Sequence, residues 1–355
     1  MKILVITMAG IGDSLLSTPF VHEVRANFPE AQIDALVMWA GAKELLAGNP
    51  HVNRVHQENL IKSGKFKAIR FLWSLRRERY DISINAHPQS RKHYRIAARI
   101  IGAKLRVSHE YECSGWLDRL LVNRTIPQDY SKHTIENNLE LLPLVGARTL
   151  LPGHEMELYL SKEEKDRAAA FLAGKKLEGR KTLGVHVGSG GTKNLPLKRW
   201  PLENYLKLIP RLNRERPDIS ILLFGGPEEQ PAHQQIIAAT GGGPTLVAET
   251  KNLRETAALM ARCEGFLSVD TALMHVAATV KVPRQFVIEA FTLNATNLPY
   301  GNPYTLIPNP VIGGRHLEYY RYDGGDIKGT REELIRVMSS VTVEEVFKAV
   351  SGGMP

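Results

Sequence analysis

The chain has 355 residues, of which 43% are apolar and 23% are charged, and its formal net charge is +9. At about 100–200 residues per domain, this length predicts two domains that each bury a core of their own. No segment approaches the about 20 consecutive apolar residues that a transmembrane helix requires, so we expect a protein that does not span a membrane.

The N-terminal part alternates short β-rich runs with helical patterns. The first run, residues 3–7, is followed by Gly10 where a signal peptide would still be apolar, so it predicts a strand and not an export signal. A helix is expected over residues 14–27. Further strands are expected over residues 31–37, 81–85 and 106–108, with residues 50–55 leading to another. This alternation predicts a parallel sheet with crossover helices, as in a Rossmann-type unit.

A linker is expected between about residues 150 and 180, where the pattern changes to a charged helix. Ser161 and Glu164 form a capping-box pattern at the start of that helix, which is expected to end at Leu172. The earlier rhythm then restarts and predicts a second α/β sheet. Its strands are expected over residues 182–187, 219–224 and 265–268, and its helices over residues 201–215 and 230–239.

These patterns predict an α/β protein with domains over residues 1–158 and 176–355, two Rossmann-like domains facing a central cleft. Such a pair is called the GT-B architecture. Residues 341–350 have the pattern of a capped amphipathic helix that closes the fold, with packing back on the first domain as one possibility.

The two cysteines, Cys113 and Cys263, are distant in sequence and lack metal-type spacing. We therefore expect neither a disulfide framework nor a metal site, and a reducing cytoplasm as the compartment.

A glycine turn with one acidic residue directly follows the first strand. Open α/β sheets bind their ligands at this carboxyl end of the strands. Gly10 and Gly12 allow a tight turn and close backbone approach to a ligand, with Ser14 beside them. Asp13 stands at a helix N-terminus, which leaves two interpretations: it only caps the helix, or it serves as a general base for a sugar hydroxyl.

A second glycine-rich loop follows the strand over residues 182–187. Its candidate ligand-binding residues are Ser189, Gly190, Gly191 and Thr192. Backbone N–H groups of such a loop can hold phosphate, although the Walker A pattern is absent. At the next helix start, Lys198 is favoured as a phosphate ligand, whereas Trp200 is expected to pack in the core.

A third constellation joins the strand over residues 265–268 to a helix N-terminus, where N–H groups can hold a diphosphate. Its residues are Asp270, Thr271, Ala272 and Leu273. His275 follows within one helical turn, where a lone histidine is more often structural than a ligand.

Four motifs, in order over about residues 1–300, together resemble glycosyltransferase family 9, which contains the ADP-heptose:lipopolysaccharide heptosyltransferases. The motifs are Gly12-Asp13, Lys198-x-Trp200-Pro201, Phe224-Gly225-Gly226-Pro227-Glu228 and Asp270-Thr271-x-x-Met274-His275-x-Ala277-Ala278. The resemblance implies an inverting, metal-free transfer without a cofactor, from a nucleotide-sugar such as ADP-heptose to a phosphorylated, lipid-linked glycan acceptor such as the lipopolysaccharide inner core.

The resemblance also implies residue roles. Asp13 would be the general base, Lys198 would hold the donor phosphates, and the Asp270-Thr271 turn would lie on the nucleotide-sugar. Glu228 or Glu229 would reach the ribose or adenine. Two departures leave heptose versus another sugar open: Ala272-Leu273 replaces a common Gly-Pro, and residues 289–297 depart from a common Phe-Gly-Pro-Thr.

Basic residues gather in the N-terminal domain. They are Lys62, Lys65, Lys67, Arg70, Arg76, Arg77, Arg79, Arg91, Lys92, Arg95 and Arg99. A solvated basic face is the default interpretation, and the resemblance adds peripheral contact with the anionic inner face of the cytoplasmic membrane. Nucleic acid is not expected, because zinc-finger, RNA-binding and helix-turn-helix signatures are missing.

Two other classes of function stay open. A nucleotide-sugar epimerase or NAD-dependent enzyme is disfavoured, because Gly10-x-Gly12 lacks a third spaced glycine and no acidic residue clearly ends the second strand. A non-catalytic glycan-binding protein would need Asp13 or Lys198 to be dispensable.

Overall fold

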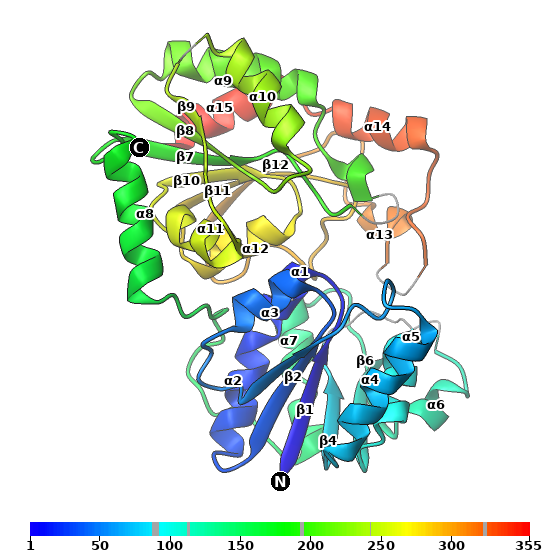
Figure 1. The fold of residues 1–355 in the computed structure, drawn as a ribbon. Coiled ribbons are helices and arrows are strands. Elements are labelled where there is room, and N and C mark those ends of the chain that lie inside the picture. Colours follow the sequence, from blue (N-terminus) through cyan, green and yellow to red (C-terminus); the bar gives the residue numbers. More distant parts are fainter. Residues whose placement is uncertain (87–91, 112–113, 192–194, 242, 322–324) are drawn as a thin grey trace. The chain divides into compact units, whose positions relative to one another are not determined.

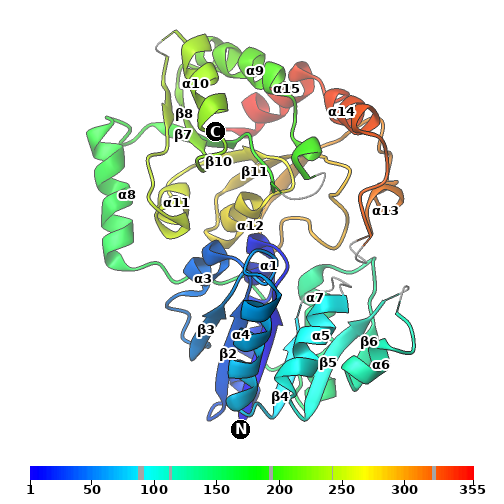
Figure 2. The ribbon, with the colours of Figure 1, turned by 45° about the vertical axis from the view of Figure 1, so that its right-hand side comes forward.

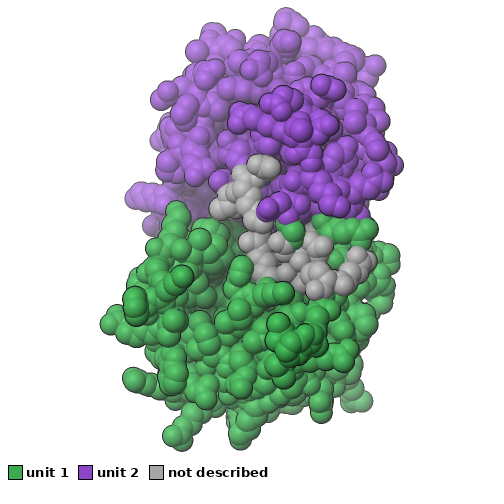
Figure 3. Space-filling view, turned by 90° about the vertical axis from the view of Figure 1, so that its right-hand side faces the viewer, with its two compact units in different colours: residues 1–159, 321–325 green, residues 160–320, 326–355 purple. Residues whose placement is uncertain are grey.

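The computed structural model describes residues 1–86, 92–111, 114–191, 195–241, 243–321 and 325–355. The chain divides into two compact units, one of residues 1–159 with 321–325 and the other of residues 160–320 with 326–355 (Figure 3). Helix α8 (Lys162–Gly174), which lies in the expected linker, belongs to the second unit.

The first unit contains a parallel sheet with the strand order β3-β2-β1-β4-β5-β6. Its strands are β1 (Lys2–Thr7), β2 (Gln32–Val37), β3 (Arg54–Gln57), β4 (Ile82–Asn85), β5 (Leu105–Glu110) and β6 (Arg124–Pro127). Alternate residues of β1 face opposite sides, because side chains alternate along a strand. Ile3 and Val5 join the core shared with α2 (Thr18–Asn27), and Leu4 and Ile6 join the core under α4 (Lys65–Arg77) and α5 (Lys92–Ile101). Helices α4 and α5 lie side by side (Figure 2).

The single helix expected over residues 14–27 is two helices, α1 (Ile11–Leu16) and α2, separated at Ser17. Pro19 explains the break, since it has no N–H to donate to the Leu15 carbonyl and so cannot continue the helical ladder. The Thr18 hydroxyl donates to that carbonyl instead, at 2.7 Å.

The second unit repeats this topology, with the strand order β12-β11-β10-β7-β8-β9. Its strands are β7 (Lys181–His186), β8 (Ile219–Phe224), β9 (Thr245–Val247), β10 (Gly265–Ser268), β11 (Arg284–Ile288) and β12 (Tyr304–Ile307). Helices α9 (Leu202–Glu215), α10 (Gln230–Ala239) and α15 (Val343–Gly353) cover one face (Figure 1). Helices α8, α11 (Leu253–Met260) and α12 (Ala272–Thr279) form the other layer.

Shorter elements complete the two units. They are α3 (Ala40–Leu46), α6 (Asp118–Leu121), α7 (Thr134–Leu139), the 3-10 helices η1 (Leu142–Val145) and η2 (Leu195–Lys198), α13 (His316–Tyr319) and α14 (Arg331–Ser339). No helix within the described ranges combines the length and the apolar character needed to cross a bilayer.

The C-terminal helix α15 packs against α9, β11 and β12 of its own unit, in place of the first-domain packing that the sequence left open. Just before this helix, the Val341 carbonyl accepts a hydrogen bond of 2.8 Å from the Trp200 indole. Trp200 is buried and meets Tyr205 edge to face, which confirms its expected role in the core.

Both units are Rossmann-like, which confirms the predicted α/β class. In each sheet the strand order reverses beside the first strand, between β1 and β4 and between β7 and β10. The carboxyl ends of strands at such a reversal form the ligand crevice of open α/β sheets. All three predicted constellations follow strands of these two sheets at that edge.

Candidate active site

In the first unit, Asp13 is the third residue of α1, in the turn that follows β1. Its carboxylate accepts the Gly10 N–H at the start of the helix. A Cβ on Gly10 would lie 2.7 Å from Asp13 Oδ2, so this approach requires glycine. The Asp13 side chain is half-buried. The capping interaction is therefore present, and it leaves the role as a base a prediction.

Two other predicted binding residues of this turn are buried. Gly12 is buried within α1. Ser14 is fully buried, and its hydroxyl donates to the Ile11 carbonyl at 2.6 Å. Since hydroxyl and carbonyl belong to the same helical turn, Ser14 supports the local fold around Asp13.

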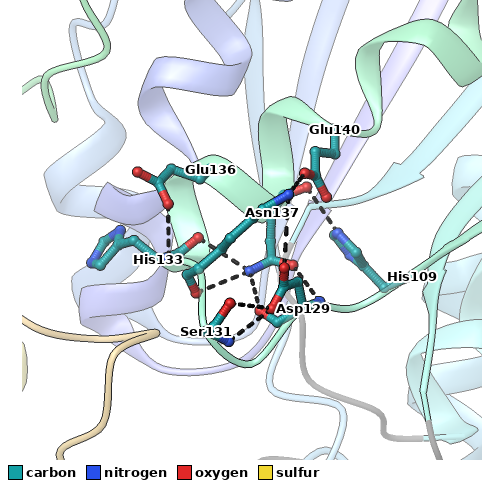
Figure 4. Close-up of polar contacts among 8 residues, drawn as sticks. His109, Asp129, Ser131, His133, Glu136, Asn137 and Glu140 are labelled. Atoms are coloured by element: carbon teal, nitrogen blue, oxygen red, sulfur yellow. Dashed lines mark hydrogen bonds and ion pairs between the residues drawn. The ribbon is translucent and has the colours of Figure 1, made fainter.

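A second loop at the same edge of this sheet, residues 128–133 after β6, was missed by sequence reasoning. The Asn137 side chain of α7 holds this loop in place. Its N–H₂ group donates to the carbonyls of Asp129 and Lys132 at 2.9 and 3.1 Å, and its Oδ1 accepts the Asp129 N–H (Figure 4). His133 caps α7 in a capping box with Glu136. The available signal was His133-x-x-Glu136, in which histidine replaces the usual serine or threonine.

In the second unit, Lys198 and Asp270 meet beside the adjacent strands β7 and β10. Lys198 Nζ donates to Asp270 Oδ2 at 3.0 Å, and both side chains are more than 90% buried. The Thr292 hydroxyl donates to the same oxygen at 2.6 Å. Burial opposes ionisation of Asp270, but Lys198 and Thr292 outweigh it and hold the pKa of this carboxyl below its ordinary value. The two predicted donor-binding residues thus form one buried ion pair.

The glycine loop after β7 lies against Glu229. A Cβ on Gly188 would lie 2.7 Å from Glu229 Cδ, and one on Gly191 would lie 3.1 Å from Glu228 Oε2. Glu229 is buried and accepts the Gly226 N–H at 2.8 Å, whereas the Glu228 side chain is 72% exposed. Of the two acids expected near a ribose or adenine, Glu229 supports its own turn and Glu228 extends into solvent.

Ser189 organises the same loop. Its hydroxyl donates to the Leu195 carbonyl at 2.8 Å and accepts Arg199 Nε at 3.2 Å. Gly190 sits close to Leu195, where an added Cβ would lie 3.1 Å from Cδ1. Thr192 lies outside the described residues. Arg199 also lies 3.7 Å from Glu229, so it links the β7 and β8 loops, a role that sequence reasoning missed.

Helix α12 begins at the third constellation. Thr271 caps it by accepting the Met274 N–H at 3.4 Å, and Ala272 is its first residue. Leu273 and His275 are both buried within this helix. Backbone N–H groups at such a helix start point toward the carboxyl edge of the sheet, where an anion is favoured.

Comparisons with known proteins identify the family of this chain. The sequence profile of glycosyltransferase family 9 (heptosyltransferase) matches residues 68–288, more than half of the chain. Lipopolysaccharide heptosyltransferase 2 of Salmonella typhimurium is 28% identical over 300 residues, covering 80% of this chain and 81% of that protein. Lipooligosaccharide heptosyltransferase 2 of Haemophilus ducreyi is 28% identical over 369 aligned positions, covering 98% of each. The crystal structure of a family 9 glycosyl transferase from Veillonella parvula shares the fold, with a TM-score of 0.78 and 21% identity over 99% of this chain and 96% of that one.

Proposed function

Since this chain belongs to glycosyltransferase family 9, we propose that it transfers a heptose, or a related sugar, from a nucleotide-sugar to a lipopolysaccharide inner-core or other surface-glycan acceptor. Family membership makes the chain a glycosyltransferase, in place of the epimerase, NAD-dependent enzyme or glycan-binding protein left open by the sequence. ADP-heptose is the proposed donor, supported by relatives named as heptosyltransferases.

The observation that carries the donor site is the buried Lys198–Asp270 pair beside β7 and β10. An ammonium has three N–H donors, of which Asp270 takes one, so the others can reach phosphate oxygens. Backbone N–H groups of Gly190 and Gly191 and of the α12 start supply further donors. Together they would stabilise the negative charge on the departing nucleoside diphosphate without a metal ion.

The acceptor chemistry is assigned to Asp13. As the acceptor hydroxyl forms its bond to the anomeric carbon, the bond from that carbon to the phosphate oxygen breaks, and the hydroxyl proton passes to the Asp13 carboxylate. Such a single displacement inverts the anomeric configuration. The placement of Asp13 at the carboxyl edge of the first sheet supports this role.

A thermal-shift panel of ADP, UDP, GDP and NAD tests the donor class on the intact chain. We expect ADP at 100 times its dissociation constant to stabilise the fold by about 2.7 kcal/mol, since it binds only the native state. A shift with UDP or GDP alone would preserve the transferase and replace the donor. A shift with NAD and with no nucleoside diphosphate would overturn the proposal.

We further propose that α4 holds the enzyme on an anionic membrane surface, near a lipid-linked acceptor. Phe66, Ile69 and Trp73 form one stripe of this helix and are 94%, 48% and 55% exposed, whereas Leu72 and Leu75 are buried. Five basic residues lie on the same helix: Lys65, Lys67, Arg70, Arg76 and Arg77. An exposed apolar stripe beside basic side chains is typical of helices that lie in a membrane interface.

The double variant Phe66→Ser/Trp73→Ser should bind vesicles containing phosphatidylglycerol at least about tenfold more weakly, because each ring contributes about 1.5–3 kcal/mol when removed from water. Co-sedimentation measures this binding, and added salt should weaken it further. Ile335→Ser removes an exposed apolar side chain of α14 and serves as the matched control. Equal binding by the double variant and the control would exclude this surface.

A further inference from the structure

Three potential metal ligands that are far apart in sequence meet on the first unit. They are His22 of α2, His51 in the loop before β3, and Glu157 near the end of the unit. His22 Nδ1 lies 2.6 Å from Glu157 Oε1, and His51 Nε2 lies 3.6 Å from Glu157 Oε2. One ligand atom from each residue lies within 4.8 Å of the others. We propose that these side chains bind a divalent transition-metal ion of the Zn²⁺ class.

The ligand set suits that chemistry. Imidazole nitrogen and carboxylate oxygen bind Zn²⁺ at about 2.0–2.2 Å, which places tetrahedral ligands about 3.3 Å apart. The 3.6 Å separation already fits, and the 2.6 Å separation opens by a small rotation of the carboxylate. Three protein ligands leave a fourth position for water, as in open zinc sites.

A simple ion pair explains this cluster poorly. The contact of His22 with Glu157 accounts for one imidazole. His51 stacks on His22 with ring centroids 3.7 Å apart, and its Nε2 lies 3.1 Å from the Tyr159 hydroxyl and 3.6 Å from Glu157 Oε2. Because a metal ion lies in the plane of each imidazole that binds it, one ring must turn out of this stack when the ion binds. Two imidazoles on one carboxylate supply more ligand atoms than an ion pair uses. A cation shared by all three satisfies each of them.

The surroundings hold the ligands in place and leave a path for the ion. The Glu157 N–H donates to Thr18 Oγ1 at 2.9 Å, and the His51 N–H donates to Asn49 Oδ1 at 2.8 Å. The His22 side chain is 32% exposed. A pocket of about 370 Å³, lined by residues including Pro19, His22 and Glu157, adjoins the cluster. The Tyr159 hydroxyl hydrogen-bonds His51 Nε2 at 3.1 Å, and it would bond the metal-bound water once that nitrogen binds the ion.

The location predicts a structural role for the ion. Glu157 lies in the last segment of the first unit. This segment already contacts α2, because Glu23 of that helix accepts the N–H groups of Leu150 and Leu151. His51 lies just before β3 begins, at the amino edge of the sheet, whereas Asp13 lies at the carboxyl edge. The ion would therefore fasten this segment to α2 and to the loop before β3, and would take no part in sugar transfer.

The test uses the full chain after treatment with EDTA, titrated with Zn²⁺ and with Co²⁺. We expect one equivalent of tightly bound metal by elemental analysis, a rise in Tm with Zn²⁺, and the intense visible absorption of four-coordinate Co²⁺. His22→Ala and Glu157→Gln should each weaken Zn²⁺ binding by at least about a hundredfold. The control is His154→Gln. His154 lies on the same segment as Glu157 but pairs with Glu23 of α2, so this variant should bind metal like the wild type.

Two results would overturn the inference: wild-type binding no tighter than that of His22→Ala, or a Co²⁺ spectrum without four-coordinate bands. The spectrum needs only the wild type, so it decides the matter even where a variant fails to fold. The inference stands apart from the proposed function, since metal removal should lower Tm while leaving ADP-induced stabilisation in place.

Discussion

Asp13→Asn should lower kcat for sugar transfer by about 10²–10⁴-fold, the usual contribution of a positioned general base. Asparagine keeps the size of the side chain and an oxygen that accepts the Gly10 N–H, so the turn after β1 should persist. Initial rates with ADP-heptose and a lipopolysaccharide acceptor measure the loss. Thermal shifts with ADP should match those of the wild type, because the donor residues belong to the second unit.

A second variant of Asp13 separates its two possible roles, as helix cap and as base, and a variant of another acid serves as the control. Asp13→Ala removes both the base and the acceptor of the Gly10 N–H. It should show the same loss of kcat and, in addition, a free energy of unfolding lower by about 1 kcal/mol. Glu203→Gln neutralises an acid in the first turn of α9, which has no assigned role, and should leave kcat unchanged. If Asp13→Asn keeps more than about a tenth of the wild-type kcat, the residue is only a helix cap and the base lies elsewhere.

Most inner strands of both sheets could be predicted from the sequence because their apolar runs are continuous. The strands over 219–224 and 265–268 and the helix over 230–239 have the expected bounds. The inner strand β11 and the edge strands β6, β9 and β12 were missed. Each of the three edge strands has three or four residues and is only partly buried, so no long apolar run marks it. Such strands are defined by pairing with a neighbour, which is information that lies outside their own sequence.

The places of the candidate ligand loops could also be predicted, since each motif directly follows a strand. Their internal contacts could not. Lys198 and Asp270 are 72 residues apart, and nothing in either motif indicates that they pair. The link that Arg199 makes between the β7 and β8 loops likewise depends on how neighbouring parallel strands align their ends. The metal-ligand cluster has the same origin, because His22 and Glu157 are separated by 135 residues.

Lys198→Met should destabilise the fold by about 3–5 kcal/mol, because it leaves the Asp270 carboxylate buried without its cation. It should also lower kcat/KM for the donor by about 10²–10³-fold, since a donor of hydrogen bonds to the leaving phosphate is lost. Urea denaturation measures the first effect and initial rates measure the second. Lys175→Met, which breaks the partly exposed pair with Glu249, should cost less than about 1 kcal/mol.

The double variant Lys198→Met/Asp270→Asn separates stability from catalysis. Asparagine carries no charge and still accepts the Thr292 hydroxyl, so most of the lost stability should return. Transfer should stay as low as in Lys198→Met, because the phosphate ligand is still missing. Recovery of transfer together with stability would show that Lys198 acts only by neutralising Asp270.

The pH dependence gives a third readout of the same pair. In the wild type the folded-state pKa of Asp270 is below its ordinary value of about 4, so its stabilising contribution is complete at neutral pH and is lost as the pH falls through the acid range. In Lys198→Met, burial acts without the lysine and raises that pKa, so protonation favours the folded variant as the pH falls. The difference in unfolding free energy between the wild type and Lys198→Met should therefore narrow from pH 7 to pH 5. The difference between the wild type and the double variant should not narrow in this way, because the double variant has no buried Asp270 charge to be relieved. If the difference between the wild type and Lys198→Met stays constant from pH 7 to pH 5, Asp270 does not carry the charge assigned to it.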